Sequence, residues 1–129
     1  MGIYENTVDG MMTDYVFPQE NGHHEQVKWF RIGDGKDGLL CKMEEKLGLN
    51  LANYTDESLE KAQHPFEIEK ADDVIIHLDY RQSGLGSNSC GEEQLEENKV
   101  KLQDFAMAFT VQAAECGTEI RKARKQYID

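Results

Sequence analysis

Residues 79–91 carry the side chains best suited to contact a ligand. They follow an apolar run at 74–78, and three glycines stand among hydroxyl and amide side chains. Small residues allow a sharp turn and a close approach by another molecule, while hydroxyls and amides supply hydrogen-bonding groups. Such a segment at the end of a strand can form the wall of a binding site. It can also be a wide turn between two strands, and composition alone favours that simpler interpretation.

This segment shows no signature of nucleotide or nucleophile chemistry. Gly84 and Gly86 resemble the start of a dinucleotide-binding fingerprint, but Ser89 stands where the third glycine would be and no helical pattern follows. Cys90 could act as a nucleophile only beside a base, and the sequence indicates none. The sequence therefore indicates no catalytic role for this segment.

Histidines and carboxylates elsewhere form no catalytic constellation. His23 and His24 are adjacent, so on a strand they would point to opposite faces, and no His-Glu-x-x-His pattern is present. Solvated loop histidines are the favoured interpretation. Glu20 sits in a constrained turn, but retaining hydrolases with paired carboxylates need a second carboxyl group about 5 Å away. We predict no catalytic residue and no metal site in this chain.

Composition narrows the class of protein. The 129 residues are 39% hydrophobic and 30% charged, which is typical of a globular domain with its own core. A net charge of -11 argues against binding to nucleic acid or to an anionic membrane surface. The three cysteines are odd in number and include no Cys-x-x-Cys, and no apolar leader is evident. These features predict a cytoplasmic protein without a disulfide framework.

Short apolar runs separated by turn signals predict an all-β fold, an antiparallel sandwich or barrel. The expected strands are 15–17, 27–32, 39–43, 47–54, 74–80, 100–102 and 105–111. Apolar residues on both faces of 27–32, Trp29 among them, predict a strand buried on both sides. The apolar phase slips at 103–104, where a bulge would return residues 105–111 to the core. A short helix is expected at 56–63, capped by Thr55 or Asp56.

Several motifs resemble one family in the same order. They are Pro18-Gln19-Glu20-Asn21-Gly22, a strand with Trp29, a turn with His64, a loop with Gly84, Gly86 and Gly91, and the run at 105–111. Together they resemble the C-terminal domain, or small-chain region, of the large bacterial family 2 β-galactosidases. Residues 1–112 are assigned to this domain. Residues 113–129 form a tail, expected to be a helix or an added segment.

The resemblance implies a large β-sandwich of the galactose-mutarotase type and a supporting role in hydrolysis. The family's two catalytic glutamates and its Mg²⁺ and Na⁺ ions lie in other parts of the enzyme, so no cofactor is expected here. One loop of this domain reaches the mouth of the sugar site. The matching residues are Ser87, Asn88, Ser89 and Cys90, which we predict to form part of the rim.

This chain departs from the family pattern at several positions. His23-His24 replace an Asn-Arg pair, Lys28 replaces an arginine, and Glu92 replaces a proline. The rim segment has no aromatic residue, so stacking against a sugar is not expected there.

The implied partners are the remainder of a β-galactosidase, including its barrel domain, and the β-galactoside sugar, with a homo-oligomer as a further form. The chain matches only the later part of the sandwich, so strand edges and apolar faces are expected to be uncovered. Two alternatives stay open. One is a separate carbohydrate-binding module, and the other is a purely structural or oligomerisation subunit.

Overall fold

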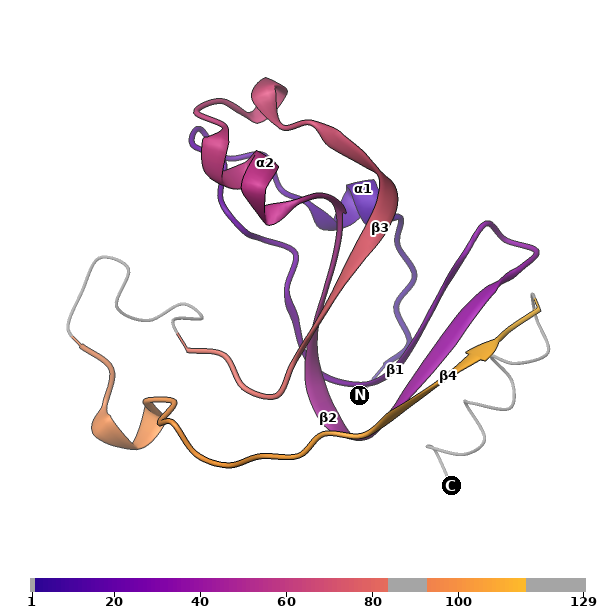
Figure 1. Ribbon diagram of the computed structural model, residues 1–129, viewed down its shortest axis with the longest axis vertical. Coiled ribbons are helices and arrows are strands. Elements are labelled where there is room, and N and C mark those ends of the chain that lie inside the picture. Colours follow the sequence, from indigo (N-terminus) through magenta and orange to yellow (C-terminus); the bar gives the residue numbers. More distant parts are fainter. Residues whose placement is uncertain (1, 84–92, 116–129) are drawn as a thin grey trace. The chain divides into compact units, whose positions relative to one another are not determined.

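The computed structural model describes residues 2–83 and 93–115, which form an antiparallel sheet with a few short helices (Figure 1). The strands are β1 (His24–Gly33), β2 (Gly38–Tyr54), β3 (Lys70–Asp79) and β4 (Phe109–Ala113). The helical segments are α1 (Val8–Met11), α2 (Asp56–Lys61) and the 3-10 turns Pro65–Glu67 and Glu96–Asn98. Strands β1, β3 and β4 each pair with β2. The predicted all-β class is confirmed, and the arrangement is consistent with a sandwich-like domain.

The described residues divide into two compact units. The first contains residues 2–25 and 48–79, and the second contains 26–47, 80–83 and 93–115. Strand β2 contributes its second half to the first unit and its first half to the second.

The first unit is built on the pairing of β2 with β3. Leu49 lies opposite Leu78 and Leu51 lies opposite Ile76, so these side chains share one face. Tyr54 on β2 is buried. The predicted helix follows directly as α2, and the Thr55 hydroxyl caps it by accepting the Ser58 N–H at 3.1 Å.

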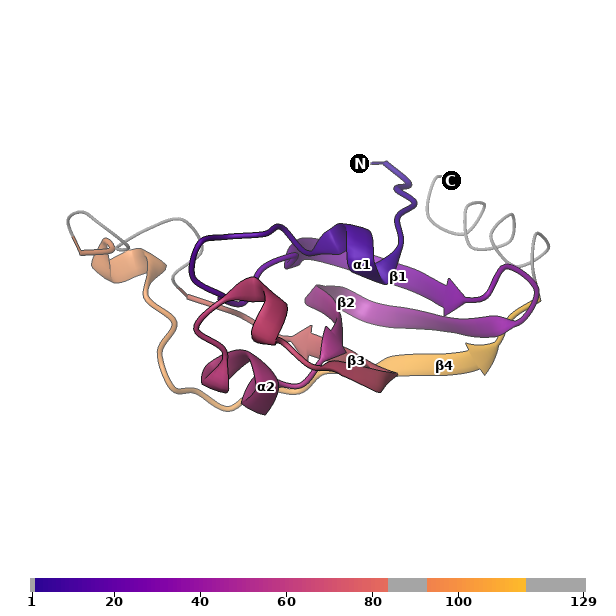
Figure 2. The ribbon, with the colours of Figure 1, turned by 90° about the horizontal axis from the view of Figure 1, so that it is seen from above.

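The second unit contains a hairpin and the β2–β4 ladder (Figure 2). The predicted loop at 33–38 is confirmed. In it the Asp34 carboxylate accepts N–H bonds from Lys36 at 2.9 Å and Asp37 at 3.0 Å. Glycine is required at both ends of this turn, since a Cβ on Gly33 would lie 2.1 Å from the Asp37 carbonyl oxygen and one on Gly38 2.2 Å from that of Ile32.

Two predicted strands are wrong. Residues 15–17 form no strand, and the exposed Val16 and Phe17 lie in a loop. Residues 99–108 also lack regular structure, and Leu102 is fully exposed, so β4 begins only at Phe109. Residues 15–17 form no ladder pairs among the described residues. Ala108 accepts the Glu44 N–H at 3.0 Å, next to the β2–β4 ladder, but residues 99–107 add no further ladder pairs there. Alternation without a partner strand does not make a strand.

Two other expectations need correction. The runs 39–43 and 47–54 are one continuous strand, because β2 passes through the exposed charges at 44–46 without a break. Trp29 and Ile32 on β1 are half-buried, whereas Phe30 is buried. The prediction of burial on both faces is therefore wrong: among the described residues, the face that carries Trp29 is only partly covered.

Candidate functional site

The glycine-rich loop starts directly after β3, and the described residues give its two ends. The last residue of β3 is Asp79, whose carboxylate lies near the His23 ring. His23 Nδ1 is 3.7 Å from Asp79 Oδ2, and His23 Nε2 is 2.8 Å from Glu25 Oε1. The imidazole is therefore held between two carboxylates at the end of the strand that leads into the loop.

The His23 side chain is only 8% exposed, so the expectation of a solvated loop histidine is wrong here. Glycine at position 48 makes room for the ring, because a Cβ there would lie 2.6 Å from His23 Cε1. Within the described part of the chain, the buried Nδ1 has no hydrogen-bond partner. The spacing of His23 and Glu25 could have indicated this contact, since residues two apart on a strand share a face. The contact with Asp79 had no sequence signal. His24 is exposed, and its Nδ1 lies 2.6 Å from the Gly22 carbonyl oxygen.

In the second unit, the loop's first described residues carry an aromatic stack. The rings of Tyr80 and Phe105 are stacked with centroids 4.9 Å apart, and the Arg81 guanidinium carbon is 5.7 Å from the Tyr80 ring. This stack joins the segment entering the loop to the segment leading to β4. Gln82 Oε1 is buried and has no hydrogen-bond partner among the described residues.

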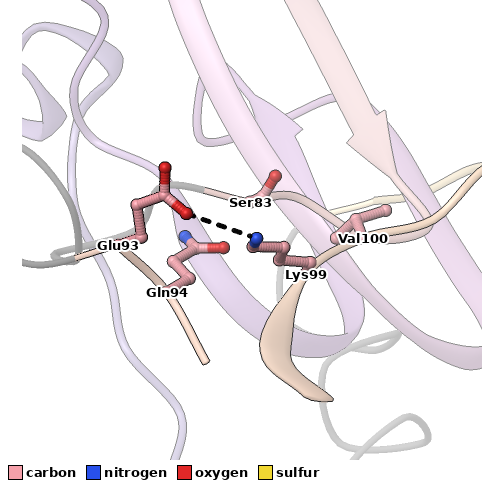
Figure 3. A pocket seen from close by; sticks show the side chains of 5 residues that line it. All are labelled: Ser83, Glu93, Gln94, Lys99 and Val100. Atoms are coloured by element: carbon pink, nitrogen blue, oxygen red, sulfur yellow. Dashed lines mark ion pairs between the residues drawn. The ribbon is translucent and has the colours of Figure 1, made fainter. Parts of the chain in front are cut away.

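A pocket of about 320 Å³ lies between the two ends of the loop (Figure 3). It is lined by Ser83 on one side and by Glu93, Gln94, Lys99 and Val100 on the other. Lys99 Nζ is 3.6 Å from Glu93 Oε2, the ion pair drawn in Figure 3, and 3.0 Å from Glu96 Oε2. Hydrogen bonds from Lys99 and then Lys101 lower the pKa of Glu96. The pocket is polar and open, with one cation shared by two carboxylates.

The motif at 18–22 is tied into the first unit by its polar side chains. The Asn21 amide accepts the Thr13 N–H at 2.7 Å and donates to the carbonyl oxygens of Thr13 and Gln19, at 3.1 and 3.0 Å. Gly22 has a φ of +82°, and a Cβ there would lie 2.7 Å from the Met11 carbonyl oxygen. Asn21 and Gly22 thus set the course of the loop.

Glu20 serves as a hydrogen-bond acceptor for the sheet. Its Oε1 accepts from Nδ2 of Asn50, a polar residue on β2 that is only 3% exposed. Burial raises the pKa of Tyr54, and the negative charges of Glu20 and Asp56 add to this rise. Around Glu20 a second pocket, of about 410 Å³, is lined by residues of the 17–20 segment and by Asp56, Leu59 and Glu60.

His64 positions a turn. Its ring stacks on Phe66 with centroids 5.4 Å apart. The Glu67 carboxylate accepts the N–H groups of Gln63 at 2.7 Å and His64 at 3.2 Å, and these bonds lower the pKa of Glu67. The motif residue is thus part of a closed turn before β3.

The predicted rim residues Ser87, Asn88, Ser89 and Cys90 lie outside the described residues, as do Gly84, Gly86 and Gly91 and the tail at 116–129. Their role stays a prediction. Within residues 2–83 and 93–115, no group of three His, Cys, Asp or Glu side chains could hold a metal ion. No helix in the described part is long and apolar enough to cross a membrane.

Comparison with known proteins gives the family. A family model described as β-galactosidase small chain matches residues 1–111. The chain is 33% identical over 109 residues to the β-galactosidase of Actinobacillus pleuropneumoniae, covering 84% of this chain and 10% of that protein. It is 29% identical over 97 residues to that of Staphylococcus xylosus, covering 75% and 10%. For that of Kluyveromyces lactis the identity is 28% over 109 residues, covering 84% and 10%.

The chain belongs to the β-galactosidase small-chain family, as its motifs predict. It spans about a tenth of the length of these relatives.

Proposed function

We propose that this chain is the small-chain part of a retaining β-galactosidase that hydrolyses terminal β-D-galactosides such as lactose. The observation that carries the proposal is the family match over residues 1–111, together with relatives that are β-galactosidases in which the matched stretch makes up about a tenth of the length. In this proposal the catalytic glutamates, and the Mg²⁺ and Na⁺ ions, belong to the larger part of the enzyme. The cytoplasm is proposed as its location, because three cysteines are an odd number and suggest no disulfide framework.

The role of this chain is to complete the enzyme's fold and to present residues 87–90 at the rim of the sugar site. The contacts at the two ends of the loop support this role, because they fix the positions from which residues 87–90 extend. His23 and Asp79 are in contact at the end of β3, and Tyr80 and Phe105 stack in the second unit. Polar groups at a rim contribute modest binding energy and selectivity for the leaving group, because each such hydrogen bond has a small net effect in water.

A chimeric enzyme tests the proposal. In the β-galactosidase of Actinobacillus pleuropneumoniae, the 109 residues that match are replaced by this chain, and turnover of a chromogenic β-galactoside is measured. The matched control lacks those residues altogether. We expect turnover by the chimera and none by the control. A chimera as inactive as the control would overturn the proposal.

A further inference from the structure

A row of apolar side chains in the second unit is exposed although its pattern is that of a core. Met107, Phe109 and Val111 alternate with small or polar residues along the segment that enters β4. Their exposed fractions are 39%, 46% and 51%. Leu39, at the start of β2, is 47% exposed. We refer to Leu39, Met107, Phe109 and Val111 as the apolar row.

The strand register places members of this row on one face of the sheet. Val111 lies opposite Cys41 and Phe109 lies opposite Met43, and directly paired residues of antiparallel strands share a face. Leu39 is on the same face of β2, because it is two residues from Cys41. The other face carries Lys42 opposite Thr110 and the fully buried Leu40 opposite Gln112. The charged and hydroxyl side chains of this ladder are therefore segregated from the apolar row.

On the apolar face, Cys41 and Met43 of β2 are buried, but the β4 residues that pair with them are not. Cys41 and Met43 on β2 are each 2% exposed, whereas their partners on β4 are about half exposed. Among the described strands β4 pairs with β2 alone, so its outer edge also has no ladder partner there. Uncovered apolar faces and free strand edges are contact sites or aggregation hazards in soluble proteins.

The family and the relative lengths point to the partner. The chain corresponds to about a tenth of each relative, so nine tenths of a β-galactosidase polypeptide is available to cover this face. We propose that the apolar row packs against an apolar sheet face of that larger part, as the inner faces of two sheets pack in a sandwich. This inference rests on the proposed function and adds to it the surface through which the two parts join.

The test places aspartate on either face of the same strand. Phe109→Asp and Val111→Asp are combined in one chimera, and the matched control carries Thr110→Asp, which adds a carboxylate on the opposite face. Turnover and the melting temperature of each chimera are compared with those of the parent. The same substitutions in the isolated 129-residue chain report on its own folding by circular dichroism and on its mass by sedimentation equilibrium.

We expect the double variant to abolish turnover, or reduce it at least tenfold, and to melt below the parent, while Thr110→Asp leaves both unchanged. In the isolated chain both variants should melt like the wild type, because the substituted side chains are half exposed. If the two chimeras have equal turnover and melting temperatures, or if the isolated double variant is unfolded, the docking surface is overturned but the proposed function is not. An isolated chain that is a dimer, dissociated by the double variant, assigns the face to a second copy and also overturns it. An inactive parent chimera overturns the proposed function and this inference together.

Discussion

The carboxylate of Glu20 accepts a hydrogen bond of 3.3 Å from the amide of Asn50, which is buried on β2. A carboxylate that sequence reasoning singled out as a candidate for chemistry is thereby occupied in satisfying a buried polar group. This contact links a family motif in an N-terminal loop to the central strand, thirty residues further along the chain.

Replacement of Glu20 by alanine should destabilise the chain. It leaves the buried Asn50 amide without its acceptor, which costs about 1–3 kcal/mol. Glu60→Ala is the control, since Glu60 is exposed and lines the same pocket, and a surface change of this kind should stay within about 0.5 kcal/mol. Urea denaturation of the 129-residue chain measures both. Equal losses would show that the contact contributes nothing.

Two glycines of positive φ should respond differently to alanine. Each substitution forces a side chain into a left-handed conformation, at a cost of roughly 1–2 kcal/mol. Gly22→Ala also drives a Cβ against the Met11 carbonyl oxygen, whereas nothing lies within 4 Å of a Cβ at Gly35. The free energy of unfolding should therefore fall more for Gly22→Ala. The reverse order would contradict the observed course of the 13–22 loop.

The hairpin turn should weaken in acid. The N–H bonds from Lys36 and Asp37 hold the pKa of Asp34 below its ordinary value of 3.8. Because the pKa is lower in the folded chain, the ionised carboxylate stabilises the fold above the unfolded-state value, and this contribution is lost as the pH falls through the folded-state value. An NMR titration of the Asp34 carboxyl group checks the direction of the shift.

The matching variant is Asp34→Asn, whose amide oxygen can still accept both N–H bonds but does not titrate. The difference in unfolding free energy between the wild type and this variant should change as the pH is lowered below 3.8. If this difference does not change with pH, the ionisation of Asp34 does not contribute to the stability of the turn.

The rim residues should affect which acceptor the enzyme prefers. In the chimera, Ser89→Ala and Cys90→Ala should each shift the ratio of kcat/KM values for two aglycones by a factor of about 2 to 10, which is the scale of one hydrogen bond. Thr110→Asp provides a control outside the loop. Identical ratios for all variants would favour the purely structural alternative, in which this chain makes no sugar contact.

Local signals in the sequence predicted the elements that depend on local chemistry. The Thr55 cap, the glycine-bounded turn at 33–38 and the strand around Phe30 all appear where expected. Their energetics are set by backbone conformation and by hydrogen bonds between close neighbours in sequence.

Elements that depend on a partner strand were less predictable. Alternation at 100–102 indicated a strand, yet Leu102 is fully exposed. The contact between His23 and Asp79 joins residues far apart in the chain, and no local pattern reports it. The half-buried Trp29 shows the same dependence, because burial of a strand's face is decided by what packs on that face of the sheet, which no local pattern reports.

The most direct measurement compares the isolated 129-residue chain with the chimeric enzyme, side by side, on a chromogenic β-galactoside. We predict turnover by the chimera and none by the chain alone. Turnover by the isolated chain would place the catalytic groups within these residues and contradict the assignment of this chain to a supporting part of the enzyme.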